Sequence, residues 1–494
     1  MMIDVLVLKN PVLVKHLRSR LRPQHLIPLV LMVVAICACI TWASMAADDP
    51  RGGLMGLITF QGLLLFLVGS SAVAAAVSNA RESGMLDFHR ISPQRPLALS
   101  LGFLLGAPVR EFILFACTLP FALVLAAEAD HTLLLWLAAT VDLLLLSPLY
   151  YSIAILAGLA LPKRTSSTTL TLMLIIFLHM GWMVQAVGCL TIIPLTAALA
   201  TDAASSVPLH TTILGFPAPA LLVCLLHQLP ILVFLLVAIT RKMRHELAYP
   251  LTKLDAISFY FVMALLLLSD APAGLAMIGP SHGGESPELG GIALSYGLAL
   301  LGCLFAALVT PDAGAFARGV RHARKLGFSH PSNWEERAAN PATVAVFAAI
   351  FLVAGIAASS LLPGPHAQSM RIMTGAFVGA CAVLFCGLAK QSFDLVFGKN
   401  SNSYFLLLLF GCWALPLIIA LSLSVVSSGD DALVTVIMAL SPIAGIGLAI
   451  AGDSAYSSVV SFAAVTASAV LAIAFAAFAA RTVRRATEAA SSVG

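Results

Sequence analysis

Charged residues are scarce in this chain of 494 residues. They make up 10% of the sequence, whereas hydrophobic residues make up 60% and the mean hydropathy is +0.99. A soluble domain carries about 25% charged residues. A water-soluble core cannot hide so much apolar surface, so lipid must solvate much of it. The scarcity of charge therefore excludes an ordinary soluble protein.

Patterns typical of metal sites and disulfide frameworks are also missing. The nine cysteines include no C-x-x-C pair, all but Cys189 lie inside apolar runs, and the twelve histidines do not cluster with them. We interpret the cysteines as small buried hydrophobes and expect no metal site.

Catalytic motifs are missing too. The zinc-protease pattern H-E-x-x-H does not occur, because the H-E-L-A-Y at His245 lacks the second histidine, and no serine nucleophile elbow is present. These absences disfavour a membrane-embedded enzyme, and we assign no catalytic residue. The phosphate-binding pattern G-x-x-x-x-G-K-[ST] does not occur either, so the chain cannot bind ATP in that manner.

Long apolar runs are what the sequence has in abundance. A helix needs about 20 apolar residues to cross a hydrocarbon layer of about 30 Å. Twelve runs meet this length, near 25–46, 54–78, 108–128, 132–160, 168–187, 216–240, 255–279, 290–310, 341–362, 370–389, 404–427 and 456–480. Two more stretches, 188–200 and 432–451, are broken by Pro194 and Pro442, and we interpret them as re-entrant or short paired helices on the outer side.

The basic residues fall on one side of this layout. With the N-terminus inside, the inner segments hold 24 Lys and Arg, whereas the outer loops hold only Arg51 and Arg371. Positive charge collects on the cytoplasmic side of membrane proteins. This asymmetry predicts that both termini are cytoplasmic.

The order of features repeats once along the chain. Each half begins inside, has its longest charged inner loop between its second and third spans (79–96 and 311–340), and carries a broken stretch before its sixth span. The sequence therefore predicts an all-α polytopic membrane protein of about 12 transmembrane helices. We expect a 6+6 parallel pseudo-repeat, with halves at 1–247 and 248–494.

The N-terminal segment 10–22 has the pattern of an interfacial helix. Asn10 can cap it, and Pro11 suits the first helical position. A row of leucines lies beside a row of cations formed by Lys15, Arg18 and Arg22. Such a helix lies on anionic inner lipids. It is either an anchor with no further role or a helix that also touches a cytosolic partner.

The inner loop 79–96 combines charge with turn signals. Its polar residues predict a short helix, which Ser92-Pro93 ends. A plain solvated connection is the alternative. The order R-E-x-G-x-L-x-x-x-x-x-S-P, from Arg81 to Pro93, resembles the coupling-helix loop of type-2 ATP-binding-cassette (ABC) exporter permeases, with Glu82, Gly84, Leu86 and Pro93 matching. The segment N-P-V-L-V-K-x-L-R-x-R-L-R from Asn10 resembles the interfacial helix that opens such permeases.

The resemblance covers residues 8–240, and the second half only in layout. It implies a transport subunit whose cofactor, ATP with Mg²⁺, sits on a separate ABC ATPase subunit. It also implies that the ATPase pushes the loop through Arg81, Glu82, Gly84, Leu86, Arg90 and Pro93, and that the two halves rock as rigid bodies.

The second inner loop, 311–340, departs from the family pattern. Arg318, Arg321 and Arg324 line one face and Phe316 and Val320 another, which predicts an amphipathic helix. Glu335 and Glu336 are its acidic candidates, but the Gly-x-Leu spacing is absent. We expect a second ATPase contact that is altered or inactive.

Three polar residues inside predicted spans are candidates for the translocation path: Asp142, His179 and His227. A carboxylate in lipid costs about 2.5 kcal/mol or more, so Asp142 should face the bundle or water. We expect an Asp–His pair across the fourth to sixth spans. It would orient helices, line the path or relay protons, and the sequence leaves these roles open.

These observations favour the permease subunit of an ABC exporter in a bacterial inner membrane. The expected partners are an ABC ATPase subunit and the lipid bilayer, with no nucleic acid. Whether one or two permease chains form the pore stays open. The alternative is a proton- or ion-coupled secondary transporter of 12 spans, although the loop motif G-x-x-x-D-R/K-x-G-R/K-R/K of one such class is missing from 79–96.

Overall fold

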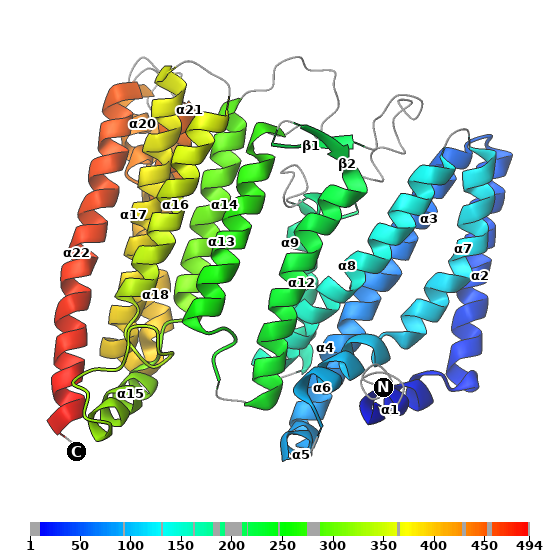
Figure 1. Ribbon diagram of the computed structural model, residues 1–494. Helices are drawn as coiled ribbons and strands as arrows, with labels where there is room; N and C mark the ends of the chain where they lie inside the picture. The colour runs from blue at the N-terminus through cyan, green and yellow to red at the C-terminus, as the bar shows by residue number, and fades with distance from the viewer. Residues whose placement is uncertain are drawn as a thin grey trace. The chain divides into compact units, whose positions relative to one another are not determined.

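The computed structural model is built almost wholly from helices (Figure 1). It describes residues 10–91, 94–129, 132–161, 164–180, 188–192, 210–214, 216–245, 248–273, 287–362, 366–426, 431–451 and 457–492. The chain divides into two compact units, the first comprising Met1–Thr212 and Phe216–Pro250, the second Ile213–Gly215 and Leu251–Gly494. The main division thus follows Pro250, whereas the sequence analysis placed it after residue 247.

The first unit holds eleven of the described helical elements. They are α1 (Pro11–Arg20), α2 (Pro23–Ala46), α3 (Pro50–Gly62), the π-helical η2 (Leu63–Gly69), α4 (Ser70–Glu82), α5 (Met85–Ile91), α6 (Pro96–Gly106), α7 (Val109–Glu128), α8 (Leu133–Ala160), α9 (Arg164–Met180) and α12 (Ala220–Arg244). Two short strands, β1 (His210–Ile213) and β2 (Phe216–Pro219), pair between α9 and α12 in the sequence.

From Leu251 onward, the regular elements that the structure describes in the second unit are all helices. Its elements are α13 (Lys253–Asp270), η4 (Ala271–Ala273), α14 (Pro287–Leu308), α15 (Ala313–Lys325), α16 (Pro341–Leu361), α17 (His366–Phe397), η5 (Gly398–Asn400), α18 (Ser401–Leu409), the π-helical η6 (Phe410–Ala414), α19 (Leu415–Val426), α20 (Asp431–Ala439), α21 (Pro442–Ala451) and α22 (Ser457–Ser492).

Within the described residues, nine helical stretches are long and apolar enough to cross a membrane. They are Pro23–Ala46, Pro50–Glu82, Val109–Glu128, Leu133–Ala160, Ala220–Arg244, Gly290–Leu308, Pro341–Leu361, His366–Ser424 and Ser458–Ser491. This finding is compatible with an all-α polytopic membrane protein.

Three differences in single helices explain why nine stretches meet the length and hydropathy criteria, whereas the sequence predicts twelve spans. The described part of α9 has 17 residues, fewer than a full crossing needs. The 18 residues of α13 include Lys253, Asp255 and Asp270. The stretch His366–Ser424 joins two runs that the sequence analysis counted separately. The twelve-span count, its 6+6 order and the orientation of the termini stay predictions.

Two expected details concern the broken stretches. The stretch 432–451 forms two short helices, α20 and α21, which meet at Leu440–Ser441 because Pro442 begins a new helix. In the stretch 188–200, residues 193–200, with Pro194, lie outside the described residues.

The outer surface of the first unit is apolar where a lipid-facing helix should be. Helix α2 buries only Val33 and Cys37, whereas Trp42 is 76% exposed and Leu31 63% exposed. Water would penalise this surface, and hydrocarbon would not.

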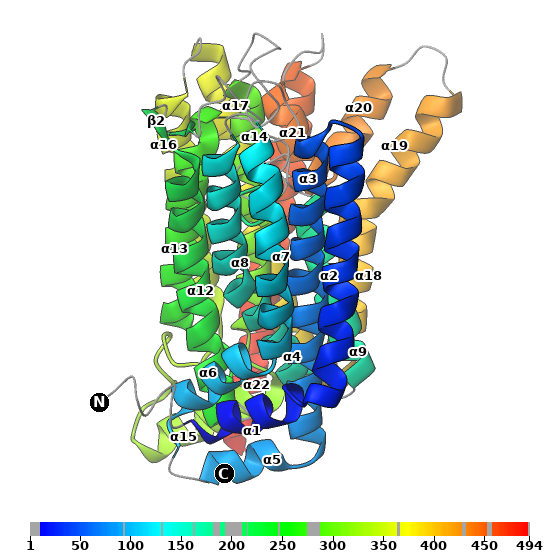
Figure 2. The ribbon, with the colours of Figure 1, turned by 90° about the vertical axis from the view of Figure 1, so that its right-hand side faces the viewer.

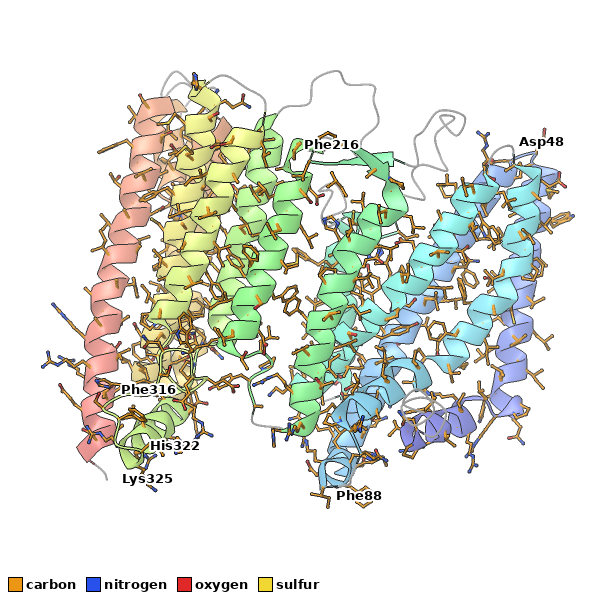
Figure 3. The ribbon with its side chains drawn as sticks, in the orientation of Figure 1. Asp48, Phe88, Phe216, Phe316, His322 and Lys325 are labelled. Atoms are coloured by element: carbon orange, nitrogen blue, oxygen red, sulfur yellow. The ribbon has the colours of Figure 1, made fainter. Side chains whose placement is uncertain are left out.

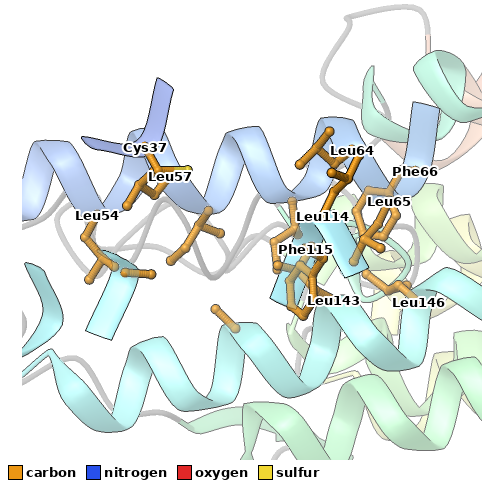
Figure 4. Close-up of a cluster of buried hydrophobic side chains, with 14 of the residues drawn as sticks. Cys37, Leu54, Leu57, Leu64, Leu65, Phe66, Leu114, Phe115, Leu143 and Leu146 are labelled. Carbon is orange, nitrogen blue, oxygen red and sulfur yellow. The ribbon is translucent and has the colours of Figure 1, made fainter. Parts of the chain in front are cut away.

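The core of the first unit is a cluster of buried apolar side chains between helices. Leu54, Leu57, Leu65, Leu143 and Leu146 are all fully buried in it, among α2, α3, η2, α7 and α8 (Figure 4). A second cluster, around Leu86, Phe103 and Met243, fills the end of the unit where α1 and α5 lie (Figure 2). The candidate residues of α1, α4 and α5 described next lie around this second cluster.

Candidate functional site

The loop after α4 forms a short surface helix, α5, as the sequence predicts. Gly84 has a φ of +70°, a left-handed conformation that a residue with a Cβ adopts only at a cost, and it turns the chain from α4 into α5. Leu86 is buried at 2% exposure in the cluster beneath. Phe88 and Ile91 are 65% and 84% exposed, and Phe88 lies at the tip of the unit (Figure 3). The helix is therefore anchored on one face and apolar on its free face.

The last two residues of α4 bind the connection between α8 and α9. Arg81 Nη1 donates to the carbonyl oxygens of Leu159 and Leu161, at 3.1 and 2.9 Å, at the C-terminal end of α8. Glu82 Oε1 accepts from the backbone N–H of Arg164, the first residue of α9, at 3.1 Å. A cation at a helix C-terminus and an anion at an N-terminus both complement the helix dipoles. Arg81 and Glu82 thus connect the start of the α5 loop to two long helices.

Arg90 connects α5 to a third long helix. Its guanidinium pairs with Asp87 Oδ1 at 2.5 Å, and its Nη2 donates to the carbonyl oxygen of Lys242 at 3.4 Å, in the last turn of α12. Pro93, which the sequence analysis counted with this group, lies outside the described residues. The structure therefore brings Arg81, Glu82, Gly84, Leu86 and Arg90 together around one short helix.

Helix α1, for which the sequence predicts an interfacial position, begins at the residues that the sequence predicts. Asn10 Oδ1 accepts from the backbone N–H groups of Val12 and Leu13, at 3.0 and 3.3 Å, and Pro11 occupies the first turn. The helix packs on α6, where a Cβ added to Gly102 would lie 2.8 Å from that of Val12. Close packing at a glycine fixes the position of α1 on the unit.

The cations of α1 do not all face the same way. Arg18 and Arg22 are exposed, whereas Arg20, which the sequence analysis did not select, is half-buried. The Nζ of Lys15 lies 2.9 Å from Met85 Sδ on α5. Helix α1 is therefore in direct contact with the start of α5.

Electrostatics around α1 favour neutral imidazoles. Burial, followed by the charges of Arg20 and Lys15, lowers the pKa of His16 to about 4. Burial and the charge of Lys15 lower the pKa of His89 on α5 as well, against a hydrogen bond with Gln94 that raises it. Positive charge is thus concentrated where α1 meets α5.

The expected Asp–His pair inside the first unit is not formed. Asp142, fully buried on α8, accepts from Gln228 Nε2 on α12 at 2.8 Å, and the same amide donates to the carbonyl oxygen of Cys189 at 2.9 Å. The ring nitrogens of His179 and His227 lie 2.9 and 2.8 Å from backbone carbonyls of their own helices. The Nδ1 of each imidazole thus meets a carbonyl of its own helix, and the amide of Gln228 meets the carboxylate.

Two buried polar groups escaped the sequence analysis. Glu111, fully buried in the first turn of α7, pairs with Arg110 at 2.6 Å. Gln61 Nε2 donates to Thr118 Oγ1 at 2.8 Å between α3 and α7. The sequence does carry a signal for both groups, because each is a polar residue within or at the edge of an apolar run.

The second unit carries a different surface helix in the loop 311–340. Helix α15 buries Phe316 and Val320 and exposes Arg318 and Arg321, so the predicted amphipathic helix is confirmed (Figure 3). Arg324 Nη1 donates to the carbonyl oxygen of Ser491 on α22 at 3.3 Å. The α15 helix therefore packs against the end of its own unit.

The rest of this loop is held by a buried lysine. The Nζ of Lys253, at the start of α13, donates to the carbonyl oxygens of Asn333, Ala338 and Ala339, at 3.0, 2.8 and 3.0 Å. Three carbonyl acceptors satisfy all three donors of the ammonium group. This lysine orders the segment that carries Glu335.

Comparisons with known proteins return no match among protein-family models, curated proteins or solved structures. Within the described residues, no group of three or more His, Cys, Asp or Glu side chains is placed to hold a metal ion. The functional assignment therefore depends on the residues themselves.

Proposed function

We propose that this chain is the transmembrane permease subunit of an ABC transporter of the exporter type, driven by a separate ATPase subunit. The observation that carries the proposal is α5. This helix exposes two large apolar side chains at the end of the first unit and is connected to α12 by Arg90. The end of α4, which leads into α5, is connected to α8 by Arg81 and to α9 by Glu82.

The free face of α5 suits a protein partner. Phe88 and Ile91 are exposed at 65% and 84%, beside the Asp87–Arg90 ion pair. Interfaces are commonly centred on buried aromatic or aliphatic anchors with a polar rim. A cleft on the ATPase that receives Phe88 and Ile91 would bury most of the exposed area of α5.

The connections of α5 suit the transmission of movement. A push on α5 acts through Arg90 on the end of α12. By way of the adjoining end of α4, it also acts through Arg81 on the end of α8 and through Glu82 on the start of α9. Coupling passes most directly through packed elements and hydrogen bonds of this kind. Three long helices of the first unit would then move with α5.

The membrane layout belongs to the same proposal. Twelve spans in a 6+6 order, with both termini cytoplasmic, would place α1 and α5 on the inner face of a bacterial inner membrane. The arrangement within the first unit supports this, because Phe88 of α5 and Asp48 lie at opposite ends of it (Figure 3). Basic residues accompany α1 and α5, and acidic Asp48 and Asp49 precede α3.

One observation favours a second candidate, a proton-coupled secondary transporter. Within the described residues, Asp142 Oδ2 is buried and has no hydrogen-bond partner. Ionisable groups buried in membrane spans are frequent in proton relays. A secondary transporter has no ATPase subunit for α5 to bind. The two candidates therefore differ in whether α5 recruits an ATPase.

The test is co-purification of an ABC ATPase from the native host with the tagged full-length chain. We expect an ATPase with phosphate-binding motifs in the wild-type complex. The variant Phe88→Ser/Ile91→Ser should retain less than about a tenth of it, because loss of interface anchors costs about 2 kcal/mol or more each.

The matched control is Phe216→Ser, which removes a 74%-exposed aromatic side chain from the far end of the first unit (Figure 3). It should retain the ATPase at the wild-type level. Equal retention by the α5 variant and the control would refute the docking role of α5.

A further inference from the structure

A pocket of about 350 Å³ lies in the first unit, where α1, α4, α5 and α6 meet. Its polar lining includes Lys15, His16, Arg20, Asn79, Ser83 and His89. Val12 and Phe103 belong to its apolar lining. The volume is large enough for a phosphate group together with several water molecules, since a water molecule occupies about 30 Å³ in the liquid.

The charged side chains that line this pocket are all positive. Lys15 and Arg20 are cations, and no carboxylate is among its lining residues within the described part of the chain. The nearest acidic influence on Arg20 is Glu111, which is already paired with Arg110. The two cations therefore lack an anion of their own inside the pocket.

Arg20 is the more informative of the two. It is half-buried, and within the described residues it makes no hydrogen bond or ion pair. Partial burial weakens the solvation of its guanidinium and is the largest cause that lowers its pKa. Its donors are therefore free to bind a ligand in the pocket that carries several acceptor oxygens.

Lys15 has a weak partner that a phosphate oxygen could replace. Its Nζ lies 2.9 Å from the thioether sulfur of Met85, which is a weak acceptor. A phosphate oxygen forms a charge-assisted hydrogen bond that is about twice as strong as a neutral one. The neutral imidazoles of His16 and His89 and the amide of Asn79 add uncharged donors.

We infer that this pocket binds a phosphate group, with Lys15 and Arg20 as its charged ligands. The source that fits best is the headgroup of an anionic phospholipid, because an amphipathic basic helix, α1, forms one wall of the pocket. Free inorganic phosphate shares the same chemistry. Since α1 supplies both cations and α5 supplies Met85 and His89, a bound phosphate bridges the two helices and fixes the position of α5.

The test is native mass spectrometry of the delipidated full-length chain, titrated with phosphatidylglycerol, phosphatidylcholine or inorganic phosphate. We expect one tightly held phosphatidylglycerol. Phosphatidylcholine should bind several-fold more weakly, because its choline cation opposes Lys15 and Arg20. The variant Lys15→Gln/Arg20→Gln should weaken the affinity for phosphatidylglycerol by about tenfold or more.

The matched control is Arg18→Gln/Arg22→Gln, which removes the same charge from the same segment at exposed positions outside the pocket. It should change the affinity less than about twofold. An equal loss in both double variants would mean diffuse attraction of α1 to anionic lipid and would overturn the site.

Two further outcomes are decisive. Pocket-dependent binding of inorganic phosphate, without binding of phosphatidylglycerol, would keep the phosphate site and overturn the lipid as its source. If the double variant does not fold, the single change Lys15→Gln at an exposed position replaces it. Unchanged affinity in that variant would overturn the role of Lys15.

Discussion

The carboxylate of Glu82 accepts a hydrogen bond from the backbone N–H of Arg164, 3.1 Å away and 82 residues later in the chain. The bond joins the last residue of α4 to the first residue of α9. A residue that the sequence analysis assigned to contact with an ATPase thus contacts its own chain. Both roles are compatible, because a residue at the base of α5 can transmit what α5 receives.

Arg81 should contribute measurably to the stability of the first unit. Arg81→Ala removes a charged donor from the carbonyl oxygens of Leu159 and Leu161 at the end of α8. We expect the free energy of unfolding to fall by about 1–3 kcal/mol, measured by denaturant unfolding in detergent. Arg95→Ala, at an exposed position just before α6, is the control and should change it by less than about 0.5 kcal/mol. Equal effects would show that the two carbonyls do not depend on Arg81.

Gly84 should be required for its backbone conformation and not for space. A Cβ at this position meets no atom within 4 Å, but the φ of +70° disfavours any side chain. Gly84→Ala should lower the stability by about 1 kcal/mol. Gly411→Ala, which also has open space but lies in a helix without a positive φ, should be neutral or stabilising. The same sign in both variants would contradict the argument.

The lowered pKa of His16 predicts that the packing of α1 on the first unit depends on pH. Its pKa in the folded chain is about 4, below its ordinary value of 6.5. The stability that it contributes is therefore complete above about pH 6.5 and is lost as the pH falls towards 4, because the undocked helix binds the proton first. The groups that face it carry positive charge or none: Lys15 and Arg20 on α1, and His89 on α5.

Hydrogen exchange of the α1 amides, corrected for the intrinsic rate, measures this dependence. We expect faster exchange at pH 4.5 than at pH 7 in the wild type and a smaller pH effect in His16→Gln. The exposed His25→Gln should keep the wild-type dependence. A pH effect that survives in His16→Gln would assign it to another group.

Substitutions of Asp142 distinguish a role in stability from a role in proton coupling. Asp142→Asn keeps an oxygen acceptor for Gln228 Nε2, so we expect a change in stability below about 1 kcal/mol, whereas Asp142→Leu should lose about 1–3 kcal/mol. ATP-driven activity should survive in the asparagine variant. Its loss in a fully stable protein would assign a protonation role to Asp142 and favour the secondary transporter.

Local signals in the sequence predicted much of this fold. The long apolar helices, the Asn10 cap and the amphipathic helix α15 depend on residues close together in the chain, and the structure has all three. The π-helical turn in Pro50–Glu82 has no such signal, because it depends on how the helix packs. Residue type alone did not indicate it.

The polar contacts were harder to predict for a physical reason. The partner of Asp142 is 86 residues away, and the adjacent residues Gln228 and His227 can both donate to a carboxylate. The partner of Glu82 is a backbone N–H, which almost any residue provides. The pocket between α1 and α5 depends on contacts such as that between Lys15 and Met85, 70 residues apart. Only the packing of the helices determines these pairs.

The most direct measurement of the central claim is ATP hydrolysis by the co-purified ATPase, reconstituted with this chain in lipid. Glu82→Ala should lower the chain-stimulated rate by about tenfold or more, since it breaks the link from the end of α4, next to α5, to the start of α9. Asp87→Ala, an exposed acid on α5 itself, should lower it much less. Both variants should retain the ATPase and stay folded, although Glu82→Ala should lose about 1 kcal/mol of stability with its exposed hydrogen bond to Arg164. A full rate in Glu82→Ala would contradict coupling through this loop.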